Sequence, residues 1–288
     1  MDVKRFVTGA AVVALLGGVH AAPAAAQSRP LVTEDPETVP VGNMLVEAGL
    51  DLEQDALFPA SGLRGRLWKF GTFGLSIGIS SFAEVQVDGG VRNGLRVESI
   101  EPAPLTSMLD FTGDTTSDIE DLRFGTKIRF LNETGSTPAM AVRFWTRLPN
   151  ASNESGLGLD TTDFHVGMAV AKTVQSVRVA GNFGWGLLGD PVRGDDQNDV
   201  IEYGLSVARA VAKGAEIVAE INGRLSTRAT DELVPVGTET LSVARFGGRF
   251  THGPVRIDGA MLIGVTERDP TWGFTFGMTW VFKAFDPQ

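Results

Sequence analysis

The sequence predicts an all-β fold: a transmembrane antiparallel β-barrel of about 12 strands in an up-and-down meander. Three observations predict it. Apolar and polar residues alternate along most of the chain, which gives each segment the two unlike faces of a β-strand. Short and long gaps separate these segments in turn, as periplasmic turns and outside loops do in outer-membrane barrels. An apolar leader precedes the strands, so the protein is expected to leave the cytoplasm.

Residues 1–26 are the predicted signal peptide. Lys4 and Arg5 form a basic start, residues 6–19 are an apolar run, and Ala24-Ala25-Ala26 is a cleavage site. A transmembrane anchor is the weaker interpretation, because the run is short and ends in small residues. We therefore expect the mature chain to begin at Gln27.

The mature chain divides into three predicted parts. Residues 27–42 form a periplasmic N-terminal segment, residues 43–283 form the barrel, and residues 284–288 form a periplasmic tail. After Val19 no apolar run reaches the ~18–20 residues that a membrane helix needs, so a membrane-embedded form of this chain must be a barrel.

Composition excludes several classes of function. The 288 residues carry a formal net charge of −10 and no cysteine. An acidic chain without a basic tract is a poor nucleic-acid binder, and without cysteine there is neither a disulfide framework nor a thiolate metal site. We predict no cofactor, no metal and no catalytic residues.

The strands follow from the gaps in chain order. Five gaps are short: 69–72, 131–138, 174–176, 211–214 and 252–254. Six are longer and rich in Gly, Asp and Asn: 54–61, 89–118, 149–160, 189–198, 227–238 and 267–271. The two kinds alternate, which leaves twelve strands with both termini periplasmic; ten to fourteen is the range that the pattern permits.

Residues 89–118 allow two interpretations, a further strand or a loop. The stretch 91–99 resembles a further spanning strand, but counting it gives an odd total and places the gap 131–138 among the long loops. We therefore expect residues 89–118 to form one long outside loop, or a plug.

The apolar faces are predicted to point outward to lipid. The polar faces are rich in Gly, Ala, Ser and Thr, which suits a confined lumen. The apolar faces are long, near the ~9–11 residues that a tilted strand needs to cross the membrane. In the last strand, Gly273–Phe282, the outward residues are predicted to be Phe274, Phe276, Met278, Trp280 and Phe282. Trp145 has the parity of an inward residue. With a single Tyr, the interface belts must come from Trp and Phe. A secreted soluble β-sandwich remains the alternative fold.

Charged residues of the polar faces are the candidate site. Arg147 is expected opposite Asp163, because the two lie at equal offsets from the middle of the loop between them. Two interpretations stay open: a salt-bridge lattice that fills the lumen, or a charged constriction that selects solutes. The lumen-lining candidates are Arg143, Arg147, Asp163, His165, Arg178, Glu202, Glu220, Arg224, Arg245, Arg249, Arg256 and Asp258.

Three runs at strand ends and loops carry a family resemblance: residues 112–122 (TGDTTSDIEDL), 147–164 (RLPNASNESGLGLDTTDF) and 188–191 (LGDP). They resemble the outer-membrane transporter family called "MetA-pathway of phenol degradation", over residues 40 to the end. The resemblance implies a link to the uptake of hydrophobic or aromatic compounds and brings no catalytic residues with it.

The predicted function is that of an outer-membrane channel or transporter for passive uptake of small solutes, with hydrophobic or aromatic compounds as candidates. A structural or adhesive envelope barrel with a filled lumen is the alternative, and a membrane-embedded hydrolase is a third class. The expected partners are outer-membrane lipid and lipopolysaccharide, the barrel assembly machinery and a small-molecule solute. The expected location is the cell outer membrane, after cleavage of the signal peptide.

Overall fold

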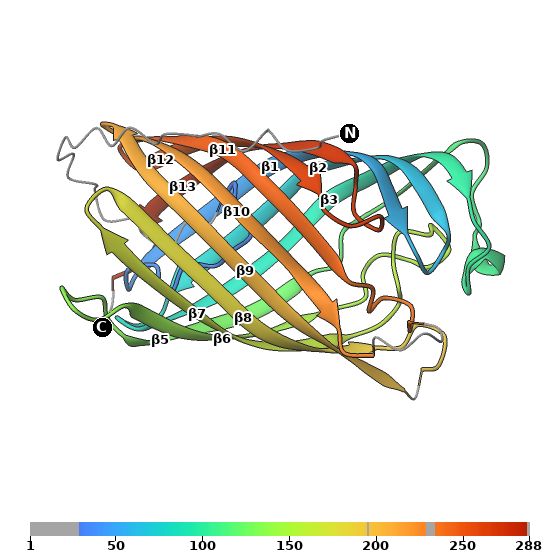
Figure 1. Ribbon diagram of the computed structural model, residues 1–288, viewed down its shortest axis with the longest axis horizontal. Coiled ribbons are helices and arrows are strands. Elements are labelled where there is room, and N and C mark those ends of the chain that lie inside the picture. The colour runs from blue at the N-terminus through green and yellow to red at the C-terminus, as the bar shows by residue number, and fades with distance from the viewer. Residues whose placement is uncertain (1–28, 195, 229–233, 287–288) are drawn as a thin grey trace, which may run out of the picture.

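The computed structural model describes residues 29–194, 196–228 and 234–286. Within these residues, twelve long antiparallel strands close into a barrel and one short extra strand adds to it (Figure 1). The predicted signal peptide, residues 1–26, lies outside the described residues. No helix in the described part of the chain is long and apolar enough to cross a membrane.

The strands follow one another in a meander, which confirms the predicted fold class and strand number. Each barrel strand pairs antiparallel with its neighbours. The twelve are β1 Asn43–Phe58, β2 Leu63–Gly78, β3 Ala83–Ile100, β5 Arg123–Leu131, β6 Ala139–Arg147, β7 Asp163–Val174, β8 Val177–Gly189, β9 Gln197–Ala212, β10 Ala215–Ser226, β11 Leu241–His252, β12 Val255–Gly264 and β13 Trp272–Lys283.

The first and last strands close the barrel. β1 pairs with β13 from Asn43 opposite Lys283 to Gln54 opposite Trp272. Closure gives each of the twelve barrel strands a neighbour on both sides, so their backbone groups can be paired, as a structure surrounded by lipid requires.

The apolar face points outward, as predicted. In β13, Phe274, Phe276, Met278 and Trp280 are exposed, whereas Thr275 and Thr279 between them are buried. The same alternation recurs in β7, where Phe164, Val166 and Met168 are exposed and face away from the lumen. A soluble sandwich would bury these side chains, so the outward apolar belt excludes that alternative.

Two of the predicted gaps are wrong. Residues 69–72 lie inside β2, and residues 89–100 belong to β3, which pairs with β2 as far as Leu63 opposite Ile100. The turn between these strands is at residues 79–82 instead. Gly71 has φ of 67°, and the register between β1 and β2 shifts at this level. Such a bulge moves the following side chains to the other face, so a continuous strand loses its alternation and resembles a turn.

The stretch after β3 covers one end of the barrel. It contains the short helix η1 Thr106–Met108 and the extra strand β4 Thr115–Asp118, which pairs with β3. Thr116 donates a hydrogen bond to the Ser155 carbonyl (2.8 Å), which ties β4 to the loop between β6 and β7. Beneath them lies a small apolar core of buried residues, Ala56, Leu63, Leu67 and Leu95.

The expected periplasmic N-terminal segment is wrong for the part that the structure describes. Residues 29–40, which we call the lumen segment, run inside the barrel and contact side chains of β3, β5, β8, β10 and β12. The Ala284 and Phe285 amides of the predicted tail donate to the Gly42 carbonyl, so the end of β13 lies beside the end of the lumen segment.

Candidate functional site in the barrel lumen

The lumen segment binds the wall through side chains and not as an added strand. Pro30, Pro36 and Pro40 lack an N–H and have a fixed φ, which prevents a regular ladder. Backbone amides donate instead to polar wall residues. The Val32 and Thr33 amides donate to the Glu220 carboxylate at 2.8–3.0 Å, which fixes this stretch against β10.

Two acids of the lumen segment form ion pairs deep in the barrel. Glu34 Oε1 lies 2.8 Å from Lys127 Nζ, and Asp35 accepts hydrogen bonds from the Arg178 guanidinium, with Nη2 2.7 Å from Oδ1. Nearer the turn between β5 and β6, Glu37 pairs with Arg129. Three acids of one short segment therefore neutralise three basic residues of the wall.

Lys127 is the most enclosed of these cations. Its side chain is fully buried, and Nζ also lies 3.0 Å from Glu84 Oε1. Glu84 in turn accepts a hydrogen bond from the Val39 amide. A buried charge is tolerated only when it is paired and hydrogen-bonded, so β3, β5 and the lumen segment depend on one another at this point.

Burial raises the pKa of the Glu34 carboxyl, but the charges of Lys127 and Arg143 and the hydrogen bonds to it outweigh burial and lower the pKa to about 2. Glu133, in the turn between β5 and β6, behaves alike. Burial raises its pKa, but hydrogen bonds from the Thr173 amide and Arg178 lower it overall. Both carboxylates are therefore held in the charged form that binds the basic wall.

Arg29 occupies a niche made by two glycines. Gly49 and Gly277 are cross-strand partners in β1 and β13, and a Cβ at Gly277 would lie 2.3 Å from Arg29 Nε. The guanidinium donates to Thr275 Oγ1 at 3.0 Å and to the Phe276 carbonyl at 2.9 Å, and its Nε lies 3.6 Å from Asp258 Oδ1. The absence of two side chains is what makes room for the arginine.

Other predicted candidates pair along the wall. Arg147 lies opposite Asp163 in the register and donates to it at 2.7 Å, as its offset from the loop predicts. Arg147 also binds Asp121 at 2.6 Å. The further pairs are Arg245 with Glu220 (2.9 Å), Arg249 with Glu216 (2.6 Å), Arg256 with Glu216 (3.9 Å) and Arg224 with Glu239 (3.5 Å).

His165 takes part in an aromatic stack. Its ring lies parallel to the inward ring of Trp145, with centroids 3.4 Å apart, and its Nδ1 lies 3.0 Å from Glu202 Oε1. The guanidinium carbons of Arg123 and Arg143 lie 5.6 and 5.9 Å from the centre of the Trp145 ring. This cluster presents cations and an aromatic surface to the lumen at one level.

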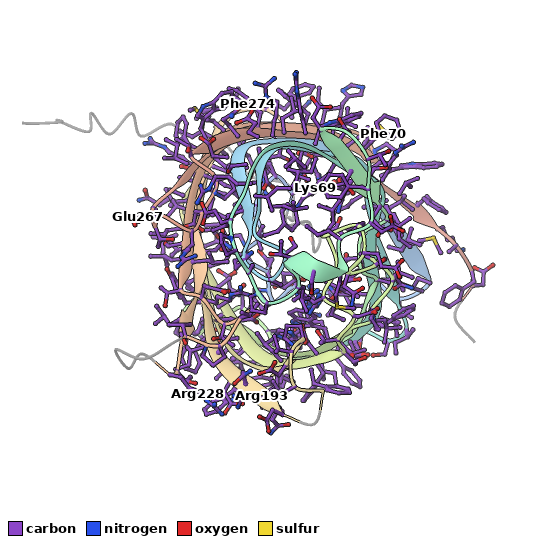
Figure 2. The ribbon with its side chains drawn as sticks, turned by 90° about the vertical axis from the view of Figure 1, so that its right-hand side faces the viewer. Lys69, Phe70, Arg193, Arg228, Glu267 and Phe274 are labelled. Carbon is purple, nitrogen blue, oxygen red and sulfur yellow. The ribbon has the colours of Figure 1, made fainter. Side chains whose placement is uncertain are left out.

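Two adjoining cavities remain beside the lumen segment. The larger, of about 390 Å³, is lined by residues such as Glu47, Asp51, Lys69 and Asp88; the smaller, of about 280 Å³, is lined by Trp145, Glu202 and a wall that includes Gly167 and Gly184. Val32 and Glu34 border both cavities. Figure 2 looks into the barrel from the end with the long loops, and Lys69 points into the lumen while Phe70 and Phe274 point outward.

The structure thus brings all the sequence-predicted candidates to the lumen but divides them into two groups. Arg143, Arg178, Glu220 and Asp258 contact the lumen segment. The others pair with residues of other strands or, as Arg224 does with Glu239, of a loop. The lumen segment itself is not predicted by the sequence pattern. The only signal available was charge: Glu34, Asp35 and Glu37 precede a barrel whose predicted lumen is rich in arginine.

Comparison with known proteins supports the fold. No family model and no curated protein matches the sequence. The crystal structure of an outer membrane channel from Pseudomonas putida F1 is similar, with a TM-score of 0.60 and 14% identity, over 86% of this chain and 98% of that chain. The translocator domain of autotransporter NalP from Neisseria meningitidis (TM-score 0.49, 12% identity, 83% and 88% covered) and LpxR from Salmonella typhimurium (0.46, 10%, 83% and 100%) are also similar. The likeness to the Pseudomonas putida channel shows that this chain has the fold of an outer-membrane β-barrel.

Proposed function

We propose that this chain is an outer-membrane channel for passive uptake of small solutes, and that the lumen segment narrows it. The observation that carries the proposal is the form of the docking. Residues 29–40 fill the lumen through ion pairs and side-chain hydrogen bonds, beside two open cavities, and not through a strand ladder. Ion pairs can be exchanged for water and counter-ions, so this closure is reversible.

Hydrophobic or aromatic solutes are the substrate class that we favour. The Trp145–His165 stack supports this choice, because the Trp145 ring borders a cavity that glycine backbone also lines, and a planar ring can pack against both. The resemblance to the phenol-degradation transporter family points to the same class. We further propose that residues 1–26 are removed, that the barrel assembly machinery inserts the chain, and that the chain has no enzymatic activity.

A liposome-swelling assay with phenols, aromatic acids and sugars of similar size tests the solute class. Faster swelling with aromatic solutes than with sugars of equal size supports the proposal. Equal rates would contradict the proposed selectivity but not the channel. If folded protein gave no flux of any solute, the channel function itself would be contradicted.

The rival function is a structural barrel with a permanently filled lumen. The density of wall-to-wall ion pairs, such as Arg147 with Asp163 and Arg249 with Glu216, favours it. The two functions differ in one respect. Weakening the binding of the lumen segment to the wall increases flux through a channel, whereas a structural barrel stays impermeable.

A further inference from the structure

Four arginines form a patch on the outer wall of the barrel. Arg64 and Arg66 of β2 and Arg96 of β3 lie beyond Trp68, toward the end with the long loops, and Arg92 of β3 lies opposite Phe70. Arg66, Arg92 and Arg96 are exposed, and Arg66 is the direct cross-strand partner of Arg96. We call these four residues the arginine patch.

The patch is charged without sufficient compensation. Like charges directly opposite each other on antiparallel strands repel, so the Arg66–Arg96 pair destabilises this part of the sheet unless an anion lies between the two. Arg66 donates to the neutral Gln54 amide oxygen at 3.1 Å, and Arg92 donates to the Ser117 hydroxyl at 3.1 Å.

The carboxylates near the patch are weak partners. Asp114 lies 3.5 Å from Arg96, but both side chains are about two-thirds exposed (65% and 69%). Glu101 lies 3.8 Å from Arg64 and is itself 57% exposed. Exposed pairs of this kind are screened by water and salt and contribute little, so the arginine patch keeps a local positive charge in an acidic protein.

The patch stands at the edge of the apolar belt. Trp68 and Phe70 follow Arg64 and Arg66 along β2 and are 46% and 57% exposed, and Phe70 points outward in Figure 2. The Trp68 ring lies across Gly94 of β3, between Arg92 and Arg96; a Cβ at Gly94 would lie 3.1 Å from Trp68 Cε2. Tryptophan side chains of membrane proteins gather at the level of the lipid headgroups, which places Arg66 and Arg96 at that level or just above it, and Arg92, opposite Phe70, just below it.

The geometry points to a binding site for the phosphate groups of an outer-leaflet lipid, that is, of lipopolysaccharide. Guanidinium groups match phosphate oxygens in a two-pronged geometry and stay charged at all relevant pH values. A phosphate between Arg66 and Arg96 removes their repulsion, while Trp68 and Phe70 pack against the acyl chains below. This inference rests on the proposed outer-membrane location, and it is independent of whether the lumen conducts.

The test is a binding titration of the purified full-length protein in detergent with diphosphorylated lipid A, followed by native mass spectrometry. The double variant Arg66→Gln/Arg96→Gln is expected to bind at least about tenfold more weakly, because two charge-assisted contacts are lost. Arg209→Gln is the matched control. Arg209 pairs with the outward residue Ile217 near the opposite end of the barrel, and its substitution is expected to leave binding unchanged.

Two further arms identify the source of the phosphate. Removing the phosphates from lipid A is expected to weaken its binding to the wild-type protein as much as the double substitution weakens binding of the phosphorylated lipid. Inorganic phosphate alone is expected to compete poorly. Heat-dependent gel mobility verifies that each variant is folded; if the double variant does not fold, Arg92→Gln replaces it. Equal binding by wild type and folded variant, or equal binding of the phosphorylated and dephosphorylated lipids, overturns the inference. Lipid binding without conductance would contradict the proposed channel and leave this site standing.

Discussion

Glu34 of the lumen segment and Lys127 of β5 form an ion pair at 2.8 Å, and the Lys127 side chain is fully buried. The two residues are far apart in the sequence and belong to different parts of the fold. Their pairing links the stability of the barrel wall to the position of a segment that lies in the lumen. If the segment leaves, Glu84 is the ion-pair partner that remains to Lys127 among the described residues.

Replacing Glu34 by Gln is expected to weaken docking of the lumen segment by roughly 1 to 3 kcal/mol, since Lys127 loses one of its two carboxylates but keeps Glu84. The chain has no cysteine, so a Leu31→Cys reporter is the only thiol. Leu31 is buried against Ala208 and Val218, and its labelling rate should rise roughly 5- to 100-fold with Glu34→Gln. The control Glu267→Gln, at an exposed loop position (Figure 2), should leave the rate unchanged.

Docking is also expected to depend on pH. The pKa of Glu34 is lowered from its ordinary value of 4.5 to about 2 in the docked state. A lowered pKa means that the charged form favours docking, so this contribution is complete above pH 4.5 and disappears as the pH falls toward 2. Conductance should therefore rise between pH 4.5 and pH 2, and Glu34→Gln should flatten the rise. An identical rise in the variant would show that other groups control the closure.

Gly277→Ala tests the niche for Arg29. The added Cβ would lie 2.3 Å from Arg29 Nε, so the guanidinium must leave its contacts with Thr275 and Phe276. Labelling of the Leu31→Cys reporter should accelerate. Gly181→Ala is the matched control, because its Cβ would have only the Gly204 carbonyl nearby, at 3.7 Å. If the two alanine variants label alike, the niche does not hold the segment.

Phe276→Arg tests the outward belt. Phe276 is 55% exposed in the middle of β13, and a charge on the lipid face near the bilayer centre costs roughly 2 to 4 kcal/mol. The fraction of the protein that migrates as the folded band when an unboiled sample is run on a gel should fall. Phe285→Arg, in the tail beyond the last strand, should fold as the wild type does. Normal folding of Phe276→Arg would mean that this face does not contact lipid.

The fold was largely predictable because the residues of a barrel wall alternate locally between outward apolar and inward polar side chains. Alternation in β7 or β13 specifies which side chains face out, and the strand count follows from the gaps. The prediction failed where the code is interrupted. At Gly71 a bulge changes the face of β2, so a strand was divided and the true turn at residues 79–82 was missed.

The lumen charges were predictable as a set, but their partners were not. Parity along a strand places Arg147 and Arg178 inside, and equal offsets from the middle of the loop between β6 and β7 identify Asp163 as the partner of Arg147. Arg178 binds Asp35, 143 residues away. The lumen segment has no periodicity, because its prolines prevent pairing with a strand, so nothing local in the sequence assigns it to the interior.

Single-channel recording in planar bilayers, comparing the full-length chain with a chain that lacks residues 29–37, tests the central claim most directly. If the lumen is a solute path narrowed by this segment, the shortened barrel should insert and conduct severalfold more than the full-length chain. If both folded barrels show the same low conductance, or none, the lumen is a filled structural core and the chain is not a channel.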